Sequence, residues 1–246
     1  MKTTRTIALL CAALAGNAAS AAQWSIDIET GAAGSGYCDV RVPGTTGDDI
    51  SFTDDLSAET TAYFRARLGM LLGEKHQFYI ELAPLTIESS GTLDAAADFD
   101  GITFAAGDPL DASFRFDTYR MLYRYLYRNR EDERAGFGVS LLLRDAELIV
   151  ESATQQGTDD NIGLVPLFGF EYARRVGEKW WFVFDINAAA ASQGRAEDLF
   201  VGAKYAHSDA FEFNAGYRLI EGGADVDQVY AFAAINHLAL GATVRF

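Results

Sequence analysis

The sequence predicts an all-β protein, an antiparallel up-and-down transmembrane β-barrel of ten strands. Three observations predict this fold. Apolar and polar residues alternate with a period of two in ten segments, the connections between the segments alternate in length, and aromatic residues gather at one set of segment ends. Short turns on one side and longer loops on the other are typical of bacterial outer-membrane barrels, which have an even number of strands.

Residues 1–21 have the features of a secretory signal peptide. Lys2 and Arg5 precede a short apolar core, and the Ala-Ser-Ala at 19–21 is a small-x-small cleavage site. The apolar core is too short for a membrane-spanning helix, which needs about 20 residues. The predicted organisation is therefore a signal peptide over 1–21 followed by one barrel domain over 22–246.

The composition is that of an ordered, acidic protein. Hydrophobic residues make up 49% of the chain and aromatic residues 13%, with only four prolines, which disfavours disorder. The formal net charge of −15 makes nucleic acid an unsuitable partner, because phosphates require a basic surface. Cys38 would be the single cysteine of the mature chain, so no intramolecular disulfide is expected.

Each predicted strand has one apolar face and one more polar face. In chain order the segments cover 23–33, 58–72, 76–90, 113–128, 135–151, 162–176, 179–190, 197–206, 211–220 and 229–246. In the first, Trp24, Ile26 and Ile28 alternate with polar residues, and "FVFDI" in the seventh and "FEFNAGY" in the ninth repeat the pattern. Such alternation indicates strands that separate an apolar from a polar environment.

The connections support the barrel order. Those near 73–75, 129–134, 176–178 and 207–210 are short, whereas those at 34–57, 91–112, 152–161, 191–196 and 221–228 are mostly longer and more acidic. With ten strands, both chain ends lie on the short-turn, periplasmic side. Pro84 and Pro166 fall inside predicted strands, and because proline cannot donate to a ladder, each predicts a bulge or a strand end.

The fourth segment changes phase. Phe114 and Phe116 share parity with Arg120 and Arg124, so a single face would carry both aromatic and charged side chains. A bulge near Asp117 is the predicted remedy, because one extra residue exchanges the two faces. A barrel of eight strands, with one hairpin outside the membrane, remains an alternative.

The aromatic residues at the strand ends predict a girdle at the periplasmic membrane interface. Amphipathic rings prefer the headgroup zone of a bilayer. The predicted girdle residues are Trp24, Phe78, Tyr127, Tyr172, Trp180, Tyr205, Phe211 and Phe246.

The chain ends in "GATVRF", with Ala242, Val244 and Phe246 on one face. This ending resembles the C-terminal signature of Gram-negative outer-membrane proteins. The stretches "FRFDTYRMLYRYLYR", "QGRAED" and "GYRLIEGGADVDQVYAF" resemble a group of small outer-membrane barrels of unassigned function. The resemblance implies a location in the outer membrane of a Gram-negative bacterium and recognition of the last strand by the barrel-assembly machinery. It implies no activity.

The charged residues opposite the apolar faces predict a polar barrel interior. Charge on the lipid face of a barrel costs about 2–4 kcal/mol for Arg near the midplane, so the lumen is the cheaper place. The predicted lumen charge network is Arg65, Arg67, Glu81, Arg120, Arg124, Arg144, Glu171, Asp185, Lys204 and Arg218, with Asp27, Glu29 and Glu212 on the same faces. We expect these charges to pair and to fill a narrow lumen, which disfavours a wide porin.

Catalysis is the second hypothesis, in the form of a hydrolase at the barrel rim. His76 and His207 fall at periplasmic turns, and His237 lies mid-strand with a parity that points to the lumen. No serine or acid is placed by the sequence to make any of them a general base. The preferred expectation is therefore a non-catalytic, monomeric barrel with a structural or narrow-channel role, without a cofactor, in contact with membrane lipid and lipopolysaccharide.

Two further alternatives concern ligands. A soluble periplasmic lipocalin-like carrier would invert the barrel faces, with apolar residues inside and arginines at the surface. Acidic residues in the long loops raise the question of Ca²⁺, which prefers oxygen ligands, although their spacing matches no EF-hand and no metal site is predicted. These acids are Asp48, Asp49, Asp54, Asp55, Asp94, Asp98, Asp100, Asp108 and Asp111, and weak cation bridging to lipopolysaccharide is their alternative role.

Overall fold

The computed structural model describes residues 22–246 as strands joined by turns and loops. The predicted signal peptide lies outside the described residues. The strands are β1 (Ala22–Arg41), β2 (Ile50–Ser51), β3 (Leu56–Ala58), β4 (Thr61–Leu72), β5 (His76–Ala83), β6 (Thr86–Thr92), β7 (Ala97–Phe99), β8 (Ile102–Phe104), β9 (Pro109–Asn129), β10 (Glu133–Glu151), β11 (Gln156–Arg175), β12 (Trp180–Ala191), β13 (Gly194–Ala206), β14 (Phe211–Asp225) and β15 (Tyr230–Arg245). Within 22–246, no helix is long and apolar enough to cross a membrane.

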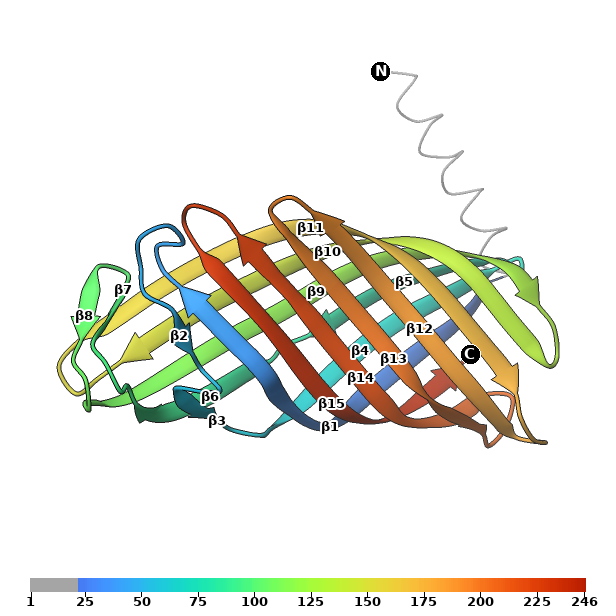
Figure 1. The fold of residues 1–246 in the computed structure, drawn as a ribbon. Coiled ribbons are helices and arrows are strands. Elements are labelled where there is room, and N and C mark those ends of the chain that lie inside the picture. Colours follow the sequence, from blue (N-terminus) through green and yellow to red (C-terminus); the bar gives the residue numbers. More distant parts are fainter. Residues whose placement is uncertain (1–21) are drawn as a thin grey trace, which may run out of the picture.

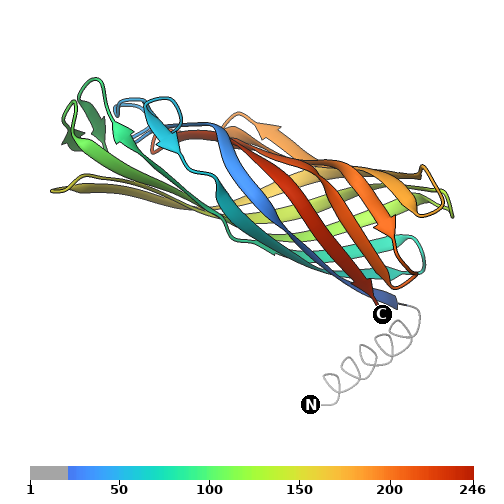
Figure 2. The same ribbon diagram turned by 90° about the horizontal axis from the view of Figure 1, so that it is seen from below.

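Ten of these strands close into an antiparallel barrel, as the sequence predicts. The ring runs through β1, β4, β5 and β9 and then through β10 to β15 in order. Pairing of β1 with β15, from Ser25 opposite Arg245 to Arg41 opposite Tyr230, closes it. Figures 1 and 2 show the strands tilted around the barrel, with the start of β1 and the C-terminus at the same end. We call this the terminal end and the opposite one the distal end.

Both prolines mark places where a strand loses a partner. Pro84 lies in the break between β5 and β6, and β9 pairs with both pieces. Pro166 lies two residues beyond Phe168, the last residue of β11 that pairs with β12. Since proline has no amide hydrogen, it fits at an edge and not inside a continuous ladder. The predicted strand end at Pro84 is thus confirmed. At Pro166 the predicted bulge or strand end is wrong, because β11 continues through it in regular pairing with β10, and the proline is tolerated since its other side has no partner strand.

The bulge predicted near Asp117 is wrong. The β9–β10 register is continuous around this residue and shifts instead between Ala135 and Gly136. Phe114 and Phe116 face the interior with their rings 5.5 Å apart, on the same side as Arg120. The two residue types share a face because the barrel interior changes along its axis, from charged to apolar.

The apolar part of the interior lies in the distal lobe, formed by β2, β3, β6, β7, β8 and the distal parts of β1, β9, β10 and β11. The sequence predicts long acidic loops here, and the structure shows that they also supply a core. Its most buried members are Val40, Ile50, Phe52, Leu56, Ile87, Phe99, Phe104, Leu110 and Val150. Backbone hydrogen bonds from Asp48 to Asp98 and from Asp100 to Val42 fasten the β7–β8 hairpin to the β1–β2 connection, at 2.9 and 2.8 Å. The lobe is therefore a packed unit on the distal parts of β1, β9 and β10.

The outer surface of the barrel wall is apolar. Leu238 and Leu240 on β15 are 69% and 60% exposed, and Phe168 on β11 is 75% exposed. Other exposed members of this apolar belt are Ile26, Ile28, Phe64, Leu68, Ile80, Leu82, Met121, Val139, Leu141, Ile162, Leu164 and Val244. Large exposed apolar surfaces require a partner, and a bilayer supplies one. The faces are thus the reverse of those expected for the lipocalin-like carrier.

Candidate functional site

The centre of the barrel interior is held by one buried aspartate. Asp198 of β13 forms ion pairs with Arg65, Arg120 and Arg218 at 2.6, 2.8 and 2.5 Å. Arg218 lies on β14, which pairs with β13, whereas Arg65 and Arg120 lie on β4 and β9, so two of the three contacts cross the lumen. All four side chains are at most 8% exposed. Their alternation on the strands aims each of them inward.

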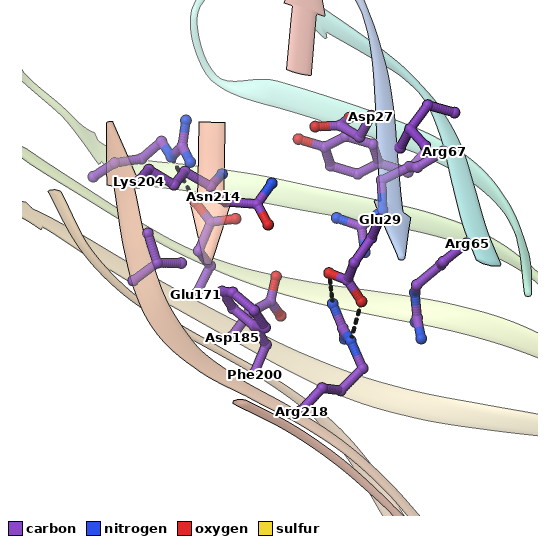
Figure 3. Close-up of a pocket in the computed structure, with 14 residues that line it drawn as sticks. Asp27, Glu29, Arg65, Arg67, Glu171, Asp185, Phe200, Lys204, Asn214 and Arg218 are labelled. Atoms are coloured by element: carbon purple, nitrogen blue, oxygen red, sulfur yellow. Dashed lines mark hydrogen bonds and ion pairs between the residues drawn. The ribbon is translucent and has the colours of Figure 1, made fainter. Parts of the chain in front are cut away.

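Two glutamates extend this central cluster. Glu29 of β1 receives both Nε and Nη2 of Arg218 at 2.9 Å, a bidentate pair that Figure 3 shows directly. Glu81 of β5 binds Nη2 of Arg65 and Nη2 of Arg67, each at 2.6 Å. Bidentate and charge-assisted contacts of this kind are the strong hydrogen bonds of proteins. Four guanidinium groups thus meet three carboxylates, an excess of one positive charge.

A second cluster lies nearer the terminal end. Arg124 of β9, which is 1% exposed, pairs with Glu171 of β11 and with Asp185 of β12, the latter at 2.8 Å. Arg134 of β10 reaches the other oxygen of Glu171 at 2.5 Å. Asn187 donates to Asp185 at 3.1 Å. Two cations and two anions therefore balance here, and the ion pairs tie β9, β10, β11 and β12 together.

The remaining predicted lumen residues are held more loosely. Lys204 lines a small cavity of about 70 Å³ beside Glu171 and Asn214, where Figure 3 shows it apart from the central cluster. Asp27 accepts a hydrogen bond from Thr243 at 2.5 Å, and Glu212 pairs with Arg245 at 2.6 Å. These contacts join β1, β14 and β15.

Arg144 and Lys204 are the two predicted network residues that form no ion pair among residues 22–246. The one hydrogen bond of Arg144 goes to Asn161 at 3.5 Å. Its Nε atom is buried without a partner. The structure therefore separates Arg144 from the clusters, and it lies beside a larger cavity between β11 and β12.

The residues of the predicted aromatic girdle lie at the terminal end. Trp180 packs against Tyr205 with ring centroids 5.0 Å apart, and Tyr127 stacks on Phe137 at 5.2 Å. Trp24, Phe78 and the terminal Phe246 are also exposed. Tyr172 on β11 and Phe211 on β14 are partly buried. Contact of these rings with a membrane interface stays a prediction.

The three histidines lie away from the distal rim. His237 is 3% exposed inside the barrel, and its ring meets that of Tyr63 edge-on at 4.7 Å. His76 shares a hydrogen bond with the hydroxyl of Tyr123 at 2.9 Å, and His207 lies in the β13–β14 turn. In the described part of the chain no cluster of three His, Cys, Asp or Glu side chains is arranged to hold a metal.

Sequence reasoning missed the residue at the centre of the network. Asp198 stands opposite the apolar face of its segment, which is a sufficient signal for an inward side chain, yet its role depends on partners from three other strands. Arg134 lies in a predicted turn and was missed because β10 begins earlier, at Glu133. The β11–β12 ladder ends at Phe168, and the sequence feature that marks this place is the nearby Pro166.

The same architecture occurs in solved outer-membrane proteins. The outer membrane protease OmpT from Escherichia coli superposes with a TM-score of 0.57 at 9% identity, over 91% of this chain and 97% of that chain. Ail, the attachment invasion locus protein of Yersinia pestis solved with the heparin analogue sucrose octasulfate, gives 0.42 at 12% identity, over 91% and 99%. No protein-family model and no curated protein matches the sequence. The likeness establishes the fold, an outer-membrane-type β-barrel.

Proposed function

We propose that the chain is an integral outer-membrane β-barrel with a closed interior and a structural rather than a conducting role. The observation that carries the proposal is Asp198, which binds arginines from three other strands, two of them across the lumen, and so blocks its centre. The apolar core of the distal lobe, with Phe99 and Phe104 at 0% exposure, covers the path beyond it. We infer that these two barriers together close the lumen.

The apolar belt and the charged interior support insertion in a lipid bilayer. The belt surrounds the wall, whereas the charges of the central cluster are paired inside, where their cost is least. We place the terminal end on the periplasmic side and the distal lobe outside the cell. The acidic distal loops then face lipopolysaccharide, and Phe246 is presented to the barrel-assembly machinery.

Catalysis is not part of the proposal. OmpT is a protease, but the three histidines of this chain lie in the interior or at the terminal end. A rim hydrolase needs a general base beside an accessible cleft at the distal end. The function is also proposed for a single chain, because the ring of strands closes on itself.

The test is the conductance of the purified full-length protein in planar bilayers. We expect no regular stepwise current from the wild-type barrel, whereas a general porin reconstituted in the same way supplies the positive control. Migration of unboiled and boiled samples in gel electrophoresis verifies that the inserted protein is folded. Reproducible current steps from the folded wild-type protein would contradict a closed interior and favour the narrow-channel alternative.

A further inference from the structure

The barrel wall is incomplete between β11 and β12. Their ladder runs from Arg175 opposite Trp181 only as far as Phe168 opposite Ala188. β11 then continues to Gln156 towards the distal end, whereas β12 turns into β13 after Ala191. Figure 1 shows the β10–β11 hairpin running on beyond the short β12–β13 hairpin. An unpaired strand edge within a barrel wall is unusual, since closure is what satisfies backbone groups in a membrane.

We call the unpaired stretch between β11 and β12 the seam. A cavity of about 380 Å³ occupies it and extends into the barrel interior, where residues of β9, β10, β13 and β14 also line it. Leu164, Pro166 and Phe168 line its outer part, and the first and last of these side chains are 62% and 75% exposed on the apolar belt. Leu142 and Arg144, which point into the barrel, line its inner part. Because residues of both wall faces line the same cavity, it passes through the wall from the level of the belt to the interior. Its size lies within the range of small-molecule sites.

The chemistry of the lining changes along this passage. The outer and middle parts are mostly apolar, with Ala189, Ala190 and Ala191 of β12 opposite the side chains of β11. Arg195, Glu197 and Glu221 also line the cavity, on the side of β13 and β14. At the inner end stands the Arg144 guanidinium, whose Nε is buried without a partner. Arg120 also lines this end, but it already forms an ion pair with Asp198 at 2.8 Å. An unpaired guanidinium at the end of an apolar passage is complementary to an anion attached to an apolar chain.

We propose that the seam is a binding site for a single-chain amphiphile with an anionic head, either a carboxylate or a phosphate. The ligand enters sideways from the membrane, its acyl chain lies along β11 and β12, and its head pairs with Arg144. This binding activity goes beyond the structural role proposed above and does not depend on conduction.

The test uses the full-length protein in micelles of a neutral detergent, with tritiated palmitate as the probe. Hexadecanol, which has the same chain length without the charge, is measured in parallel. Arg144→Gln is expected to weaken palmitate binding about tenfold or more, because a charge-assisted contact is lost, and to leave hexadecanol binding unchanged. Arg144→Lys retains the charge and is expected to retain most of the palmitate affinity.

Two further variants separate the site from general effects. Arg115→Gln removes an arginine of the distal lobe that pairs with Asp145 and Glu147, and palmitate binding is expected to be unaffected. Ala190→Trp places a large side chain in the seam lining and is expected to weaken binding of palmitate and hexadecanol alike. The heat-dependent shift in gel mobility verifies folding of each variant before binding is measured.

Equal palmitate binding by the wild type and Arg144→Gln would overturn the assignment of the head group. Unchanged binding by folded Ala190→Trp would overturn the seam as the site. Displacement of palmitate by butyrate or inorganic phosphate at comparable concentrations would show a site for small aqueous anions, and would overturn entry from the membrane. Failure of these tests leaves the proposed closed interior intact, because that is tested by conductance.

Discussion

Trp24 and Phe246 exchange both of their backbone hydrogen bonds, with each amide donating to the carbonyl of the other residue at 2.9 Å. The pair joins the start of β1 to the last residue of the chain. It completes the β1–β15 ladder, which closes the barrel, at the terminal end. The Phe246 side chain takes no part in these bonds and is 67% exposed. The backbone of the last residue therefore closes the barrel, while its ring stays exposed.

Phe246→Ala is expected to reduce barrel assembly in cells much more than it reduces stability. The backbone bonds to Trp24 remain, so the unfolding free energy of refolded protein in micelles should change by about 1 kcal/mol or less. The measurement compares the amount of folded protein in the outer membrane with denaturant unfolding of the purified variant. Val244→Ala, on the same face, is the control, and an equal assembly defect there would contradict a specific role for the terminal ring.

Asp198→Asn is expected to lower the unfolding free energy by about 3–5 kcal/mol. The substitution removes the negative charge from among three buried arginines and leaves them without their common partner. Denaturant unfolding in micelles measures the change. Asp209→Asn, in an exposed turn, should differ from the wild type by no more than about 0.5 kcal/mol. Similar values for both variants would show that the central cluster contributes little to stability.

Leu240→Arg tests the orientation of the wall. Leu240 is 60% exposed in the apolar belt, and arginine near the bilayer midplane costs about 2–4 kcal/mol in a membrane barrel. Refolding into phospholipid vesicles at increasing denaturant measures this cost. Asp227→Arg, in the exposed β14–β15 turn, should change stability little. A soluble barrel would tolerate both substitutions equally.

Tyr37 is expected to titrate late. Just distal to the apolar belt, its hydroxyl donates to Glu221, which also binds Arg195 at 2.7 Å. Burial and the bond to Glu221 raise the pKa of Tyr37 to about 12, from an ordinary value of 10. Because the folded pKa is the higher one, the stabilisation is present below pH 10 and is lost as the pH rises through 12. The difference in ultraviolet absorbance titration between the wild type and Tyr37→Phe isolates this group, and a midpoint near 10 would contradict the contact.

The Cys38 thiol is expected to be unreactive in the folded protein. Cys38 is 2% exposed in the core of the distal lobe, and burial raises the pKa of its thiol, so little nucleophilic thiolate forms. Maleimide should label it only as denaturant unfolds the lobe. Ser192→Cys, in the exposed β12–β13 turn, should be labelled at once in the folded state. Rapid labelling of Cys38 without denaturant would show that the distal lobe opens readily.

The amino-acid sequence by itself determined the strands and their two faces. Alternation with a period of two needs no knowledge of neighbouring strands, so it placed Arg65, Glu81 and Arg218 on the inward side and Leu240 on the outward side. The connection lengths then gave the up-and-down order, and the even strand count placed Phe246 beside the start of the chain. These features are local, because each follows from a few consecutive residues.

Only the tertiary structure decided which charges meet. Arg65 and Asp198 are 133 residues apart, and their contact depends on barrel diameter, strand tilt and the register of every strand between them. The distal core also explains why Phe114 and Phe116 point inward without a bulge, since the interior at their level is apolar rather than charged. The seam beside Arg144 likewise depends on where two ladders end. Closure of the ring brings distant residues together across the lumen, and no local pattern specifies such pairs.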